Sequence, residues 1–136
     1  MNTRLILLVA MAIALQLYTL DNVHADNSHG CSNSTLDGSY SYYGTGVTED
    51  GPYAVIGTLV FDGKGNATRR QSISRNGSFE TNHLSFQYSV ADNCTGKFLF
   101  KGDEFETLVI ADGGKEIYIL KESAQTVYLL AKKIHP

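Results

Sequence analysis

Tryptophan is absent from this chain of 136 residues, and proline and cysteine occur only twice each. Charged residues make up 18% and the formal net charge is −3, so the basic surface that a nucleic-acid-binding domain needs is missing. Thirteen glycines and two prolines are too few for a collagen-like repeat, and the chain is too short for two large domains. What remains is a small domain whose 43% hydrophobic residues suffice for a single core.

The first 25 residues have the pattern of a secretory signal peptide. A positive start at Arg4 is followed by an almost wholly apolar run, residues 5–20, and by a small-x-Ala sequence that ends at Ala25. The run is shorter than the ~20 residues that span the hydrocarbon layer, which favours a cleaved signal over a membrane anchor. We therefore expect cleavage after about Ala25 and a secreted or periplasmic domain, residues 26–136, without a membrane span.

Two cysteines, Cys31 and Cys94, lie within this expected domain. In an oxidising compartment a single pair most simply forms one disulfide. The close spacing that redox and metal-binding cysteine pairs use is missing. For the long loop between them, the chain-entropy model predicts a stabilisation of about 4 kcal/mol.

Turn signals such as Asp-Gly, Asn-Gly and Gly-Gly recur along the domain and divide it into short runs. Apolar residues alternate with polar ones most clearly at Leu84, Phe86, Tyr88 and Val90, which is the period of a half-buried strand. We predict eight strands, at residues 39–48, 53–61, 67–74, 83–90, 97–101, 104–111, 116–121 and 126–132.

These strands predict an all-β fold. Short connections favour antiparallel neighbours, and eight consecutive strands leave two exposed edges unless the sheet closes. Our first expectation is an eight-stranded antiparallel up-and-down barrel, the size whose interior can hold one small ligand. A two-sheet β-sandwich is the alternative, although no tryptophan between the cysteines supports it.

Three segments resemble small exported bacterial β-barrel proteins of the calycin or lipocalin-like type. They are Leu-Asp-Gly-Ser-Tyr at 36–40, Gly-Thr-Leu-Val-Phe-Asp-Gly-Lys-Gly-Asn at 57–66, and the Tyr-Ser-Val run at 88–90 leading into Cys-Thr-Gly at 94–96. The resemblance covers most of the domain and rests on hairpin and turn residues, so it implies a barrel and no particular chemistry. The Gly-x-Trp motif of true lipocalins is absent, and no catalytic residue of the similarly shaped allene oxide cyclase barrels can be matched to a position here.

Conventional catalytic motifs are missing from the sequence, including Gly-x-Ser-x-Gly, His-Glu-x-x-His and the P-loop. The weak catalytic candidates are His83, Arg69 and Arg70. His83 begins a predicted strand, where it is either a general acid or base at the barrel mouth or an exposed rim residue. Arg69 and Arg70 are adjacent on a strand, so one can point inward and bind a carboxylate or phosphate, unless this strand is solvated on both sides.

Other polar residues predict no metal site and no cofactor. His29, His83 and His135 are far apart in the sequence, and we do not expect them to converge. Glu104 and Glu106 are two residues apart on one strand, which we interpret as a solvated outer face rather than an acid–base pair. Asn-x-Ser/Thr triplets begin at Asn33, Asn66, Asn76 and Asn93; they are glycosylation sites in a eukaryote and ordinary turn sequence in a bacterium.

Tyrosine and phenylalanine are the better indication of a ligand cavity, because tyrosine combines an apolar ring with a hydrogen-bonding tip. Ordinary half-buried strand positions are an equal alternative for these residues. The residues that we expect to line a ligand are Tyr40, Tyr42, Phe86, Tyr88, Tyr118 and Tyr128.

The sequence favours an exported barrel that binds a small apolar or amphipathic molecule in its interior. One alternative is a cofactor-independent enzyme of the cyclase or isomerase kind that uses the same cavity. Another is a secreted interaction or inhibitor protein that acts through its surface, with a filled interior and an exposed patch.

Overall fold

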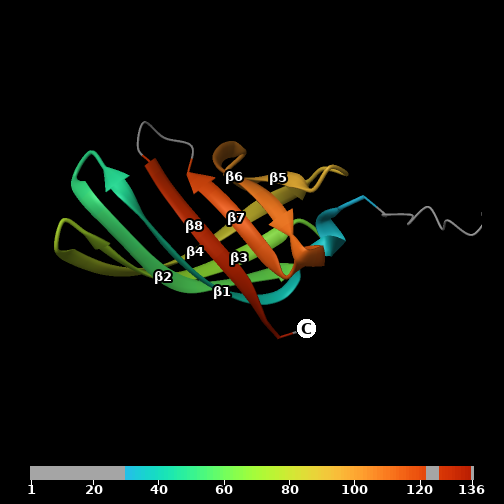
Figure 1. Ribbon diagram of the computed structural model, residues 1–136, viewed down its shortest axis with the longest axis horizontal. Coiled ribbons are helices and arrows are strands. Elements are labelled where there is room, and N and C mark those ends of the chain that lie inside the picture. Colours follow the sequence, from blue (N-terminus) through green and yellow to red (C-terminus); the bar gives the residue numbers. More distant parts are fainter. Residues whose placement is uncertain (1–29, 122–125, 136) are drawn as a thin grey trace, which may run out of the picture.

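The computed structural model describes residues 30–121 and 126–135; the expected signal peptide, its cleavage site at Ala25 and His29 lie outside them. Nearly all of the described residues belong to strands (Figure 1). The strands are β1 (Asp37–Thr48), β2 (Gly51–Asp62), β3 (Asn66–Arg75), β4 (Ser78–Val90), β5 (Thr95–Phe100), β6 (Asp103–Ala111), β7 (Glu116–Lys121) and β8 (Thr126–His135). Two 3₁₀ turns, η1 (Asn33–Thr35) and η2 (Asp112–Gly114), accompany them, and no helix in the described ranges is long and apolar enough to cross a membrane.

The strands form a closed antiparallel barrel in which each pairs with the next along the chain. β8 returns to pair with β1, so that Tyr42 lies opposite Ala131. The expected eight-stranded up-and-down barrel is confirmed, and the β-sandwich alternative is wrong, because the β1–β8 pairing leaves one continuous sheet.

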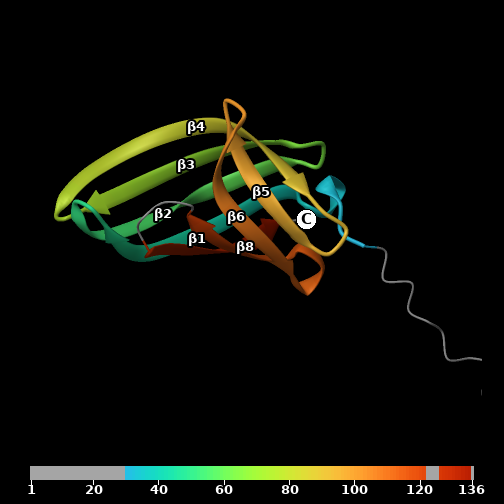
Figure 2. The same ribbon diagram turned by 90° about the horizontal axis from the view of Figure 1, so that it is seen from above.

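The two ends of the barrel differ because its strands differ in length. We call the end at which two long hairpins extend the wide end, and the opposite end the narrow end. β1, β2 and β4 have 12 or 13 residues, whereas β5 and β7 have six. The β1–β2 and β3–β4 hairpins therefore extend beyond the rest of the barrel (Figure 2). β4 pairs with β5 only over residues 87–90, so residues 78–86 of β4 pair with β3 alone among the described strands.

The opposite, narrow end of the barrel is covered by the segment that contains η1. Leu36 follows η1 and is fully buried against the core. The Tyr88 hydroxyl lies 2.9 Å from the backbone oxygens of both Asn33 and Leu36. The expected disulfide joins Cys31 to Cys94 and ties this segment to the turn between β4 and β5. The narrow end is therefore closed.

Candidate functional site

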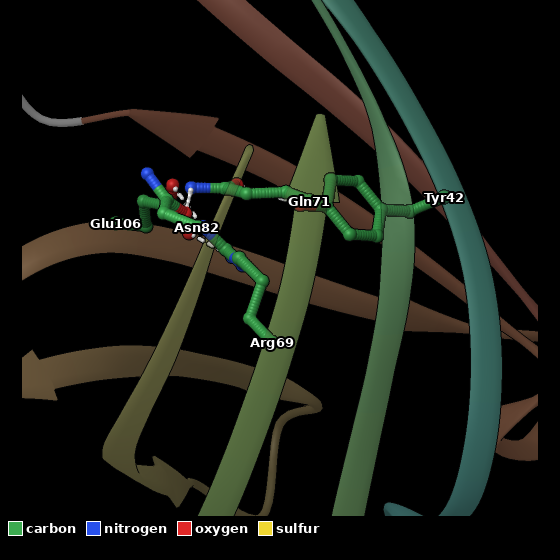
Figure 3. Close-up of polar contacts among 5 residues, drawn as sticks. All are labelled: Tyr42, Arg69, Gln71, Asn82 and Glu106. Atoms are coloured by element: carbon green, nitrogen blue, oxygen red, sulfur yellow. Dashed lines mark hydrogen bonds and ion pairs between the residues drawn. The ribbon is translucent and has the colours of Figure 1, made fainter. Parts of the chain in front are cut away.

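A buried ion pair crosses the barrel interior. Arg69 of β3 is 5% exposed and Glu106 of β6 is 3% exposed. The guanidinium donates two parallel hydrogen bonds, from Nη1 to Oε1 at 3.0 Å and from Nη2 to Oε2 at 2.5 Å (Figure 3). This two-point geometry is the strongest that an arginine and a carboxylate can form. Burial would lower the pKa of Arg69, but the charge and hydrogen bonds of Glu106 outweigh it and raise that pKa, so the guanidinium keeps its positive charge.

Aromatic rings enclose the Arg69 guanidinium. Its central carbon lies 5.3–5.9 Å from the centres of four rings, within the range of cation–π attraction. The rings belong to Tyr42, Phe86, Phe98 and Phe105. Arg69 Nε is nevertheless buried without a hydrogen-bond partner in the described part of the chain. One of the three guanidinium nitrogens is thus left without a partner among the described residues.

Strand alternation explains the position of Arg69. Ala67, Arg69, Gln71 and Ile73 are buried, while Arg70 between them is exposed on the outer wall. The inward arginine binds a carboxylate in the expected two-point manner, and that carboxylate belongs to the protein itself.

Glu106 faces the interior in regular alternation with the buried Leu108 and Ile110, and an irregularity in the β5–β6 pairing separates it from Glu104. Phe98 lies opposite Glu106, but the next residue, Leu99, lies opposite Glu104, so Phe105 is an extra residue in β6. Such a bulge interrupts the alternation of faces. Glu104 remains outside and pairs with Lys97 at 2.5 Å, whereas Glu106 turns inward. The interpretation of both glutamates as a solvated outer face is therefore wrong for Glu106.

Hydrogen bonds between three uncharged side chains lie beside the ion pair. The Tyr42 hydroxyl donates to Gln71 Oε1 at 2.7 Å, and Gln71 Nε2 donates to Asn82 Oδ1 at 2.8 Å. Figure 3 shows these side chains pointing into the same region of the interior as Arg69 and Glu106. Glycine at position 57 leaves room for the Tyr42 ring, because an added Cβ would lie 2.8 Å from it.

Tyr53 and two cations lie at the wide end. Arg75 of β3 and Lys121 of β7 each approach the Tyr53 ring to 5.8 Å, from strands on different sides of the barrel. Arg75 also pairs with Glu80 at 3.4 Å. Burial raises the pKa of Tyr53, and the positive charges of Arg75 and Arg69 partly oppose that rise. The Tyr53 hydroxyl has no hydrogen-bond partner among the residues that the structure describes.

The candidates predicted to line a ligand separate into two groups. Tyr40, Tyr42, Phe86 and Tyr88 are buried inside the barrel. The tyrosines of β7 and β8, Tyr118 and Tyr128, are 51% and 57% exposed on the outer wall, so their placement in the interior is wrong. The physical reason is the strand register: the inward residues of β7 and β8 are their aliphatic neighbours, which are Ile117, Ile119, Val127 and Leu129.

His83 also lies outside the interior. It is exposed on β4, directly opposite the outward-facing Arg70 of β3. Its predicted role at the barrel mouth is therefore not supported, because its strand turns Asn82 and Leu84 inward instead. The structure describes no group of three metal-ligating side chains, and the side chain of His135 lies outside the described residues.

An outer groove of about 720 Å³ lies beside the β5–β6 turn. Phe61, Ala67 and Phe86 form its buried part, and Phe100 and Lys101 of the turn border it. Phe86 also contacts the Arg69 guanidinium from the other direction. One ring therefore separates the groove from the buried ion pair.

Sequence patterns did not indicate Glu106, Gln71, Asn82 or Tyr53 as site residues. Each occupies a position whose inward direction depends on strand register, and no catalytic motif surrounds them. Neither a protein-family model nor a curated protein matches the chain.

Buried tyrosines make the stability of the barrel sensitive to alkaline pH. Burial, reinforced by the charges of Asp37 and Tyr88, raises the pKa of Tyr40 to about 12, and burial raises that of Tyr42 as well. In the unfolded chain tyrosine ionises near pH 10. Because the folded state holds the proton more tightly, this contribution is complete below about pH 10 and is lost as the pH rises through 12.

The free energy of unfolding in guanidinium is therefore expected to fall steeply between pH 10 and about 12. Tyr40→Phe should start from a lower stability, because the hydrogen bond to the Gly114 oxygen is lost, yet show a shallower decline over this interval. Equal slopes for the two proteins would contradict the assignment of this pH dependence to Tyr40.

Proposed function

We propose that the protein is an exported binding protein whose barrel takes up a small amphipathic molecule through its wide end. The observation that carries the proposal is the polar cluster of Tyr42, Arg69, Gln71, Asn82 and Glu106 beside an otherwise apolar core. A buried ion pair is generally no more stabilising than apolar side chains of the same volume. Packing alone therefore gives little reason for such a cluster.

Unused hydrogen-bonding capacity supports a ligand at this cluster. Arg69 Nε is buried without a partner in the described ranges, and Tyr53, whose hydroxyl can also donate, is close enough to Arg69 and Glu106 to sense their charges. A carboxylate or hydroxyl group of a ligand would accept hydrogen bonds from these donors. Lys121 adds a positive charge at the same end of the barrel, which suits an anionic group.

The wall beside the cluster supplies apolar contacts and a route inward. Leu84 and Asn82 are only half-buried and lie on the part of β4 that β5 does not cover, and Phe105 of β6 is half-buried as well. Phe86 and Phe98 lie immediately behind them, with ring centres 5.6 and 6.2 Å from that of Phe105. An apolar part of a ligand that displaced the Phe105 ring would contact these two rings.

The first experiment is native mass spectrometry of the protein recovered after export from its own cells, compared with a denatured spectrum. A small molecule that is lost on denaturation is the expected result. The second uses 1-anilinonaphthalene-8-sulfonate, an aromatic anion, as a probe in a fluorescence titration. The double variant Arg69→Met/Glu106→Leu should bind it about tenfold more weakly or worse, because charged hydrogen bonds are lost.

Arg70→Met is the matched control for this titration, since Arg70 is the neighbouring arginine and faces solvent. It should bind the probe like the wild type. Equal affinity of the double variant and the wild type would overturn the assignment of the site to this cluster, and so would a loss of affinity of the same size in Arg70→Met.

A catalytic function has less support from the same geometry. A cyclase or isomerase would need several of the candidate arginine, histidine and tyrosine side chains inside the barrel. Arg69 and Tyr42 converge there, but His83 lies on the outer wall. We therefore place ligand binding ahead of catalysis.

A second candidate function is recognition of an extended peptide by the free edge of β4. Among the described strands, residues 78–86 pair with β3 alone, and Phe79 on this edge is 72% exposed. An unpaired edge can accept another strand through main-chain hydrogen bonds. Replacing Thr81, whose side chain faces outward, with proline should abolish peptide binding in a peptide-array assay. The affinity for the fluorescent probe should stay the same.

A further inference from the structure

Exposed apolar side chains form a continuous row across five strands of the outer wall. Ile56 of β2 lies opposite Tyr43 of β1, which lies opposite Leu130 of β8. Leu130 lies opposite Tyr118 of β7, which lies opposite Val109 of β6. Directly opposed side chains on one face of a sheet are in contact range. The row therefore runs without a break around half of the barrel.

A second row lies two residues further along the same strands. Tyr128 of β8 is opposite Leu120 of β7, and Val47 of β1 continues the apolar surface toward the wide end. We call the two rows and Val47 the outer apolar patch. Its members are Tyr43, Val47, Ile56, Val109, Tyr118, Leu120, Tyr128 and Leu130, of which all but the half-buried Leu130 are 46–64% exposed. Figure 1 shows β6, β7 and β8 side by side in this part of the wall.

No charged residue lies within the outer apolar patch. The other outward positions in its second row are Ala54, Thr45 and Thr107. Among the described residues, the charges at its margin are paired: Lys132 with Glu116 at 3.0 Å, and Lys97, which lies opposite Thr107, with Glu104 at 2.5 Å. Two identical patches can therefore face each other without bringing like charges together.

The size of the patch exceeds what a monomer usually exposes. A whole tyrosine side chain has about 150–250 Å² of surface, so the three half-exposed tyrosines of the patch offer roughly 300 Å². The aliphatic side chains bring the exposed area of the patch to about 600–700 Å². The largest apolar patch on a typical monomer is roughly 300–600 Å². One partner in a standard stable interface buries about 800 Å², including a polar rim. The patch thus has the area of an interface core.

We propose that the outer apolar patch is the contact surface of a homodimer. A sheet face that is broad and free of charge fits a second copy of itself, and two such faces pack about 10 Å apart with interdigitating side chains. The contact is isologous, so Tyr43 and Tyr118 of each copy lie against the patch of the other. The wide end of each barrel remains open, because the patch lies on the wall and not at the mouth.

Sedimentation equilibrium of the folded, disulfide-bonded protein recovered after export tests this proposal. The wild type should be a dimer at micromolar concentration. Tyr43→Lys/Tyr118→Lys places two charges at the centre of the contact and should raise the dimer dissociation constant by about 100-fold or more. Both side chains are exposed. At a protein concentration below the wild-type dimer dissociation constant, the unfolding midpoint of the variant should therefore equal that of the wild type.

Phe79→Lys is the matched control, because Phe79 is the most exposed of the large apolar side chains and lies on β4, outside the patch. This variant should remain a dimer. A wild type that is monomeric at the highest soluble concentration would overturn the proposal. Binding of a different partner to the patch would not rescue it. A dimer that persists in the double lysine variant, or one that Phe79→Lys dissociates, would overturn it as well.

Discussion

Replacing Glu106 with leucine alone is expected to lower the free energy of unfolding by about 3–5 kcal/mol. The substitution leaves the Arg69 guanidinium buried without its counter-charge and without two hydrogen bonds. The four surrounding rings attract a cation, each by about 2 kcal/mol when desolvated, but they supply no hydrogen-bond acceptor in the plane of the guanidinium. They cannot replace a carboxylate that accepts both hydrogen bonds. Guanidinium unfolding followed by tyrosine fluorescence measures the change.

Glu104→Leu is the matched control for this prediction. Glu104 is on the same strand and forms an ion pair of equal length with Lys97, but its side chain and that of Lys97 are 41% and 48% exposed. Water and ions screen such a pair, so its loss should cost no more than about 1 kcal/mol. If the two leucine variants lose similar stability, burial of the Arg69–Glu106 pair does not have the consequence that we assign to it.

Removing both charges should reverse most of the loss. Arg69→Met/Glu106→Leu replaces the pair with apolar side chains, and such replacements of buried pairs are often neutral or stabilising. The double variant should therefore be at least about 2 kcal/mol more stable than Glu106→Leu. If it also fails to bind the anionic probe, the ion pair serves recognition and not stability.

Most of the fold could be predicted from the sequence because its determinants are local. Asp-Gly and Asn-Gly turns mark the hairpins, and alternation along residues 84–90 defines a face without any knowledge of the partner strands. The same alternation requires Arg69 and Arg70 to point in opposite directions. Closure follows from the number of strands, because an open sheet of eight would expose two edges.

The faces of β7 and β8 could not be predicted in this way. β7 contains Ile117, Tyr118, Ile119 and Leu120 in sequence, so both of its faces are apolar and the period of two gives no direction. The exposed face belongs to the outer apolar patch. Residue type alone therefore places Tyr118 and Tyr128 in the interior, although the aliphatic residues beside them fill it.

The placement of Glu104 and Glu106 on opposite faces depends on an irregularity rather than on a pattern. A bulge at Phe105 changes the face of every residue before it relative to those after it. Nothing in the residues from Asp103 to Thr107 identifies the extra residue. The extra residue, Phe105, lies against Phe86, so this departure from regular pairing adds a ring to the candidate site.

Replacing both cysteines with serine is expected to lower the free energy of unfolding by about 3–4 kcal/mol. The bond between Cys31 and Cys94 closes a loop that spans 63 positions, and its loss gives the unfolded chain that conformational freedom back. The segment it ties down also contributes native contacts, because Asn33 Oδ1 accepts a hydrogen bond from the Val90 amide at 2.8 Å.

Reduced wild-type protein is the control for the serine variant. Both should unfold at the same guanidinium concentration, below that of the oxidised protein, because both lack only the cross-link. The candidate binding site lies toward the opposite, wide end, so folded molecules of either form should keep the probe affinity of the oxidised protein. A weaker affinity would show that the narrow end and the wide end of the barrel are coupled, and an unchanged unfolding midpoint would contradict the stabilising role of the disulfide.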